Sequence, residues 1–269
     1  MAKYVNVYAG RLNFLSGSRS ETEQYLKELT SARGHLLKEN EFAWRFGGIH
    51  LAGQSITGKF GKEKLIKNMT QFDERRNDFV EKPTRKGEAF YSNFCIFLNE
   101  NIILFERKFG VGHIEFVKAF SAVYNKAHGR GNLEVELLKD KEEILAIMER
   151  ADMVTSIEFS IKPTNPDAGE ESRKVDDMLK EIRAKKSGMS FSNNEEGIDY
   201  KKKGSIVSSA IALCNRGYGK YNVKTKKGEE EVRIESIKKL IKEHTKAPET
   251  GKELEFFASI WRKIKRRLE

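Results

Sequence analysis

The sequence has only two cysteines, four prolines and no long apolar run among its 269 residues. Cys95 and Cys214 lie in the apolar segments "NFCIF" and "IALCN", which favours small buried side chains over a disulfide framework or a zinc site. No stretch approaches the roughly 18 apolar residues that a membrane span requires. The first residues also lack the apolar run of a signal peptide. We therefore expect a soluble, cytoplasmic protein.

Motifs that mark common catalytic sites are also missing. There is no GxxxxGK[ST] or GxGxxG loop for a nucleotide and no GxSxG elbow for a nucleophilic serine. The five histidines are scattered, and no two have the i, i+4 spacing that places metal ligands on one helix face. No helix-turn-helix, zinc-finger or RNA-recognition motif is present. The sequence thus predicts no cofactor, no metal site and no catalytic residue, and it favours a protein without enzymatic activity.

One enzymatic alternative stays open, which is metal-dependent cleavage of phosphodiesters by a nuclease or toxin. Its carboxylates converge in space and need not be close in sequence. A strand pattern of Asp followed by Glu-x-Lys is absent in clear form, with "VELLK" the nearest match. Surface solvation explains most of the acids that lie in or beside predicted strands. These acids are Asp73, Glu74, Glu100, Glu134, Glu136 and Glu158.

Positive charge is the most informative feature that is present. The formal net charge is +10. Residues 1–150 contain 24 bases against 20 acids, residues 151–196 contain 7 against 10, and residues 197–269 contain 19 against 10. Clustered positive charge is typical of a surface that neutralises a polyanion. Nucleic acid is the favoured partner and an anionic membrane surface the second, while a solvated lysine-rich face explains the charge equally well.

Residues 200–228 carry eight Lys or Arg and no Asp or Glu. Binding of phosphates requires several cations on one surface and is indifferent to base sequence. Tyr200, Tyr218 and Tyr221 lie among these cations; they either stack on bases or anchor a hairpin, and anchoring is favoured. The predicted DNA-binding residues are the cations of this segment and of the last helix: Lys201, Lys202, Lys203, Arg216, Lys220, Lys224, Lys226, Lys227, Arg262, Lys263, Lys265 and Arg266.

The order of predicted elements indicates the α+β class, with two lobes of mixed antiparallel sheets and flanking helices. In the first lobe, "CIFLNENIILFERKF" predicts a hairpin that turns at "NEN", and "GHIEFVKAFSAVYNKAHG" predicts a core helix that stops at Gly129. A looser charged stretch is expected over residues 72–90. Pro163 and Pro166 follow a predicted strand and mark a hinge. We therefore predict an N-terminal lobe over residues 1–152 and a basic C-terminal lobe over residues 153–269.

Three further elements are predicted in the second lobe. "GEESRKVDDMLKEIRAKKSG" predicts an exposed charged helix, and the small residues of "SIVSSAIALC" favour a helix over a buried strand. "KYNVKTKKGEEEVRI" predicts a hairpin that turns at "KKGE". The last helix carries an apolar stripe at three- and four-residue steps, so one side of it is expected to pack against protein.

This layout resembles that of the RexA-like phage-exclusion proteins. The resemblance rests on "SIEFSIKP" (156–163), followed by a charged helix and "DYKKKG". It also rests on "CIFLNENIILFERKFG" (95–110) before a helix, and on a basic terminal helix after "EEEVRIESIKK". It implies a two-lobed α+β homodimer that binds double-stranded DNA without sequence preference and acts in antiphage defence of the abortive-infection type, with a membrane protein as a possible effector partner. Lys201 and Lys203 occupy the positions that would carry that family's basic patch.

Overall fold

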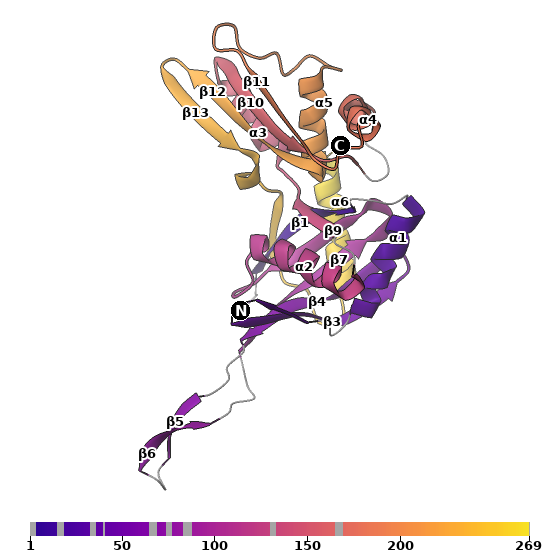
Figure 1. Ribbon diagram of the computed structural model, residues 1–269, viewed down its shortest axis with the longest axis vertical. Helices are drawn as coiled ribbons and strands as arrows, with labels where there is room; N and C mark the ends of the chain where they lie inside the picture. Colours follow the sequence, from indigo (N-terminus) through magenta and orange to yellow (C-terminus); the bar gives the residue numbers. More distant parts are fainter. Residues whose placement is uncertain are drawn as a thin grey trace.

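The computed structural model describes residues 4–14, 19–32, 36–39, 41–64, 69–73, 77–82, 88–129, 133–164 and 169–268. These residues form two antiparallel sheets with flanking helices and a separate two-stranded hairpin (Figure 1). The predicted α+β class with two lobes is confirmed. Within the ranges that the structure describes, no helix combines the length and the apolar character needed to cross a membrane.

The first sheet has eight strands in the order β14-β1-β8-β7-β4-β3-β2, with β9 also paired to β1. One edge of β1 pairs with β14 along its first half and with β9 along its second half, while β8 pairs with the other edge. The strands are β1 (Tyr4–Phe14), β2 (Leu36–Glu39), β3 (Phe42–Ala52), β4 (Ser55–Lys64), β7 (Ala89–Phe97), β8 (Ile102–Arg107), β9 (Leu133–Leu137) and β14 (Lys242–Lys246).

Helices cover both faces of the first sheet. Because successive side chains of a strand point to opposite faces, Val7 of β1 packs on the side of α6 (Glu253–Leu268), whereas Leu12 packs on the side of α2 (His113–His128). Helix α1 (Arg19–Lys27) and the 3-10 turn η1 (Glu28–Ala32) complete the α2 side. The sheet is therefore buried on both faces around β1 and β8.

Aromatic rings dominate the core on the α2 side. The ring centroid of Phe120 lies 4.9 Å from that of Phe46 and 5.4 Å from those of Phe60 and Phe94. Helix α2 ends at Gly129, whose φ of 62° is in the left-handed region that glycine adopts without strain. The predicted core helix and its stop are thus confirmed.

The second sheet has four strands in the order β11-β10-β12-β13, and helices pack on only one of its faces. The hairpin β12–β13 and the helix α5 are present as predicted. The predicted charged helix is also present as α4, but it is shorter than the segment from which it was predicted. The elements are α3 (Lys141–Arg150), β10 (Met153–Ile161), η3 (Glu170–Ser172), α4 (Arg173–Glu181), β11 (Ser187–Ser192), α5 (Ile206–Leu213), η4 (Cys214–Tyr218), β12 (Gly219–Lys227), β13 (Glu230–Glu235) and η5 (Ser236–Lys238).

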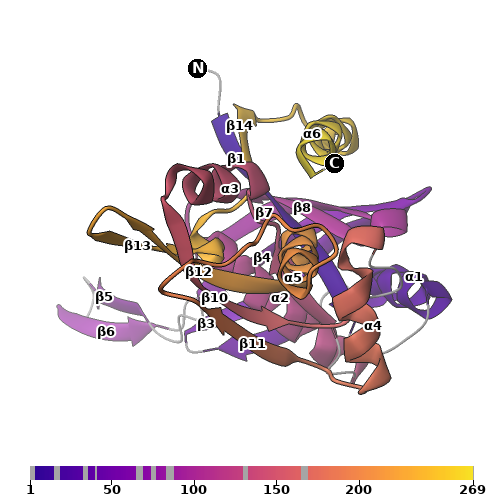
Figure 2. The same cartoon turned by 90° about the horizontal axis from the view of Figure 1, so that it is seen from above.

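The C-terminal segment returns to the first sheet. Strand β14 pairs with β1, and the buried side chains of α6, Phe257 and Ile264 among them, pack against the face formed by β1, β7 and β8 (Figure 2). The sequence predicts that residues 242–268 belong to the second lobe, but their packing places them with the first. Helix α3 packs in the core of the second sheet, although the predicted boundary near residue 152 places it in the first lobe.

The stretch predicted to be loose contains a hairpin instead. Strands β5 (Met69–Asp73) and β6 (Asp78–Lys82) pair with each other alone and project away from both sheets in Figure 1. The rest of that stretch, residues 74–76 and 83–87, lies outside the described residues. The prediction missed this pair because its charged side chains obscure any alternation of apolar and polar residues.

Both cysteines are buried and free, as the sequence predicts. Burial raises the pKa of Cys95 to about 12 and also raises the pKa of Cys214. Because the thiolate is the reactive form, we expect neither thiol of the folded protein to react with a disulfide reagent at pH ~8, while both react in denaturant. Stoichiometric labelling of the folded protein, followed by absorbance, would contradict this burial.

Candidate nucleic-acid interface

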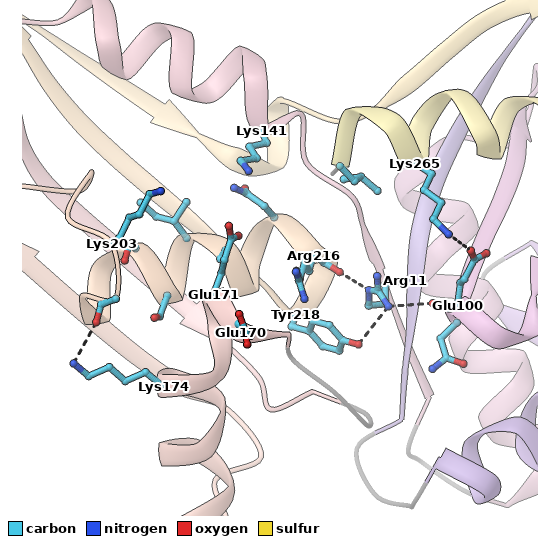
Figure 3. Close-up of a pocket in the computed structure, with 18 of the residues that line it drawn as sticks. Arg11, Glu100, Lys141, Glu170, Glu171, Lys174, Lys203, Arg216, Tyr218 and Lys265 are labelled. Atoms are coloured by element: carbon cyan, nitrogen blue, oxygen red, sulfur yellow. Dashed lines mark hydrogen bonds and ion pairs between the residues drawn. The ribbon is translucent and has the colours of Figure 1, made fainter.

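A cleft of about 1020 Å³ lies between the two lobes (Figure 3). Residues of β1, of the 3-10 turn η2 (Leu98–Glu100) and of α6 line one side, and residues of η3, α4, α5 and η4 line the other. The charged residues of its lining are seven cations and three acids: Arg11, Lys141, Lys174, Lys201, Lys203, Arg216, Lys265, Glu100, Glu170 and Glu171. The cleft is therefore predominantly positive.

Two side chains of β1 join the lobes at the floor of the cleft. Arg11 donates from Nε to the carbonyl oxygen of Arg216 and from Nη1 to that of Glu100 at 3.1 Å. The guanidinium also lies 5.0 Å from the ring centroid of Tyr218. Asn13 Nδ2 donates to the carbonyl oxygen of Gly217 at 2.8 Å. These contacts fix the turn η4 against the first sheet.

Gly217 permits this close approach. Its φ is 87°, and a Cβ at this position would lie 2.9 Å from Cβ of Arg11 and 2.9 Å from Cδ2 of Leu138. Any other residue would strain the backbone and separate η4 from β1. The role of Gly217 at the joint is evident only from its contact with β1.

Helix α5 begins at the other end of the cleft. Ser205 caps the helix, since its hydroxyl accepts from the backbone N–H of Ser208 at 3.0 Å. The exposed Lys201 and Lys203 directly precede this cap. Lys174 of α4 donates to the carbonyl oxygen of Gly204 at 3.4 Å. Three lysines therefore gather where the helix dipole is positive, an arrangement that favours an anion.

Four of the twelve predicted cations line the cleft, namely Lys201, Lys203, Arg216 and Lys265. Lys202 is exposed between two of them. Lys201 also lies 3.5 Å from Glu149, but both side chains are largely exposed and such a pair is weak. The sequence missed the other three cations of the cleft because Arg11 is isolated in an uncharged segment, whereas Lys141 and Lys174 lie among acids.

The structure places the lysines of the β12–β13 hairpin on another surface. Tyr221 and Val223 are buried against the helices, so Lys220, Lys224 and Lys226, which alternate with them, lie on the open face of the second sheet. Acids compensate the hairpin in part. Lys224 lies 3.5 Å from Glu231, and the pairing sets Lys226 and Lys227 opposite Glu231 and Glu230.

The tyrosines of this segment anchor the fold, as predicted. Tyr218 is 2% exposed and Tyr221 is 1% exposed. The hydroxyl of Tyr221 donates to Oδ1 of Asn215 at 3.1 Å. Tyr200 is partly buried against the same core. Neither of the two buried rings offers a face on which a base can stack.

The cations of α6 divide between two sides of the helix. Successive residues turn by 100°, which places Arg262 next to Lys265 and leaves Arg266 and Lys263 progressively farther around the helix from the cleft. Lys265 Nζ lies 2.8 Å from Oε1 of Glu100, and Trp261 donates from Nε1 to Oε2 of the same carboxylate at 2.6 Å. Glu100 therefore holds α6 against η2.

Three of the acids considered for a nuclease have cationic partners. Glu100 pairs with Lys265, Glu134 contacts Lys162, and Glu136 accepts from Lys139 Nζ at 2.8 Å. Among the residues that the structure describes, no group of three or more His, Cys, Asp or Glu is placed to hold a metal ion. Glu74 lies outside the described residues.

Comparison with known families gives one finding. The model of a family described as "Domain of unknown function (DUF4747)" matches residues 15–265. This match spans both lobes and all walls of the cleft except for Arg11 and Leu268. No curated protein matches the chain.

Proposed function

We propose that this member of the DUF4747 family, a domain of unknown function, binds the phosphate backbone of double-stranded DNA without sequence preference. Phosphate contacts need only several cations on one surface and carry no sequence information. Excess positive charge around the cleft supports this proposal, since seven cations and three acids line it.

The cations at the mouth of the cleft form two rows. One row precedes α5, and the other lies on α6 beside the cleft. We call these residues the rim cations: Lys201, Lys202, Lys203, Arg262 and Lys265. All five are exposed, so a duplex that lies across the mouth would meet cations from both lobes without entering the cleft.

The biological setting belongs to the same proposal and rests on the resemblance to phage-exclusion proteins. That resemblance supports a cytoplasmic homodimer that acts in antiphage defence and signals to a membrane-protein effector. The apolar side of α6 is already packed against the first sheet, so a partner or an anionic membrane surface would meet only its polar side.

A salt titration tests the binding proposal. Counterion release predicts that the logarithm of the association constant falls linearly with the logarithm of salt concentration, with a slope of about −4.5 for about five phosphate contacts. Fluorescence anisotropy with two duplexes of unrelated sequence should give the same slope and the same affinity. A flat titration, or a large difference between the duplexes, would contradict backbone binding. Incubation with Mg²⁺ and with EDTA in parallel separates binding from cleavage.

A further inference from the structure

The interior of the cleft contains a donor that no described residue satisfies. Asn215 is 4% exposed and lines the cleft. Its Oδ1 accepts the hydroxyl of Tyr221, which sets the orientation of the amide. Its Nδ2 is buried and has no hydrogen-bond partner within the described part of the chain. Since buried polar groups almost always have a protein or water partner, this amide is available to donate to an acceptor atom that replaces water in the cleft.

Cations lie beyond both ends of α5, and both groups face the cleft. Lys174 and Lys203 lie at the start of the helix, whereas Arg11 and Arg216 lie past its end (Figure 3). A helix of eight residues is about 12 Å long, so one compact anion does not contact both groups. A strand of nucleic acid does, because it carries one phosphate per nucleotide along its length.

The rest of the lining argues against a ligand made of phosphate alone. Glu170 and Glu171 also line the cleft, and carboxylates repel bare phosphates but accept from the amino groups of bases. Ala212 and Leu268, which are both partly exposed, add apolar surface against which a base can pack. A ligand that alternates phosphates with flat, polar-edged rings matches this mixture.

The size of the cleft excludes a duplex from its interior. Its volume of about 1020 Å³ lies at the upper end of the range of about 300–1,000 Å³ for small-molecule sites. A duplex is wider than its own major groove, which alone measures about 12 Å. An unpaired segment has neither the width nor the stiffness of a duplex.

We infer that the cleft binds a short unpaired segment of nucleic acid. Its phosphates lie near Lys174 and Lys203 at one end and near Arg11 and Arg216 at the other. A base or sugar oxygen accepts the hydrogen bond of Asn215 Nδ2. This inference rests on the proposed function, since it names the form of nucleic acid that passes between the rim cations into the cleft.

The test uses the full chain and a labelled single strand of about six nucleotides, within the site sizes of single-strand-binding folds. Lys174→Gln combined with Lys203→Gln is expected to weaken its binding about tenfold or more, because two charge-assisted contacts are lost. Both side chains are exposed, so folding is unaffected. The matched control is Lys118→Gln on α2, an exposed lysine outside the lining, which should bind the strand as the unaltered protein does.

A second variant tests the amide directly. Asn215→Asp keeps the acceptor for the Tyr221 hydroxyl but replaces the unsatisfied donor with an acceptor, and it should also weaken binding of the strand about tenfold or more. Thermal unfolding checks that the variant is folded. If it is not, the lysine variant carries the test alone.

Competitors identify the source of the phosphates. An unlabelled strand of the same length should displace the probe, whereas inorganic polyphosphate of equal charge and adenosine monophosphate should displace it at least about tenfold less well. Equal displacement by polyphosphate would overturn the inference, as would strand binding that is unchanged in the lysine variant. A protein that binds duplex but not the strand also overturns the inference and leaves the proposed function standing. If neither nucleic acid binds, both fail.

Discussion

Replacing Lys201, Lys202 and Lys203 together with glutamate is expected to weaken duplex binding about a hundredfold, and by a similar factor for every duplex sequence. The three side chains are exposed, so the substitution changes the charge of the rim without disturbing the core. Three lost phosphate contacts should also reduce the salt slope by about 3. Anisotropy titrations at several salt concentrations measure both quantities.

The control for this charge reversal is Lys118→Glu combined with Lys126→Glu. Both lysines are exposed on α2, which covers the face of the first sheet opposite to α6. The control lowers the net charge of the protein without altering the rim cations. It therefore separates the effect of local phosphate contacts from that of the electrostatic field of the whole protein. Equal loss of affinity in both variants, or no loss in the first, would place the DNA somewhere other than at the cleft.

Removal of the buried carboxylate of Asp176 is expected to have the largest effect on stability among the polar residues considered. Asp176 is 1% exposed on α4. It accepts the backbone N–H of Thr164 at 2.6 Å and the hydroxyl of Thr164 at 2.7 Å, and it lies 2.6 Å from Nζ of Lys180. Asp176→Ala leaves a buried N–H and a hydroxyl without their acceptor. We expect the free energy of unfolding to fall by about 2–4 kcal/mol.

The conservative variant refines this prediction. Asp176→Asn retains one carbonyl oxygen as an acceptor, so its loss should be smaller than that of Asp176→Ala. Urea unfolding followed by circular dichroism measures both variants against the unaltered protein. A loss below about 1 kcal/mol for Asp176→Ala would mean that solvent replaces the missing acceptor. The contact matters for the cleft because it ties the segment after β10 to α4, which supplies Lys174 to one wall.

Local elements could be predicted where one signal dominated. The apolar spacing of residues 113–128 and the glycine after them predicted α2 and its end. The asparagine-containing turn predicted the β7–β8 hairpin, in which Asn101 has a φ of 53°. Small apolar residues predicted α5 correctly, although a buried strand was considered for the same segment.

The joint between the lobes could not be predicted from the sequence. Arg11 and Arg216 are 205 positions apart, and nothing in the pattern of either segment pairs them. Strand β14 has the sequence "KEHTK", which lacks the alternation of apolar residues that marks a strand. Strand β14 forms because β1 has an open edge with which it pairs and because α6, which follows β14, packs on the apolar face of the same sheet. Both contacts join segments that are distant in sequence. The cleft was missed for the same reason, although four of its cations were predicted.

The return of the C-terminal segment has a consequence for synthesis on the ribosome. Trp261, Lys265 and Leu268 line the cleft, so this wall is completed only after α6 has been translated. Until then the nascent chain presents the apolar face of β1 and β8, with Val7 and Leu104, uncovered by α6. A growing chain therefore acquires its complete binding surface only after α6 has docked, and premature termination before α6 would yield a product prone to aggregation.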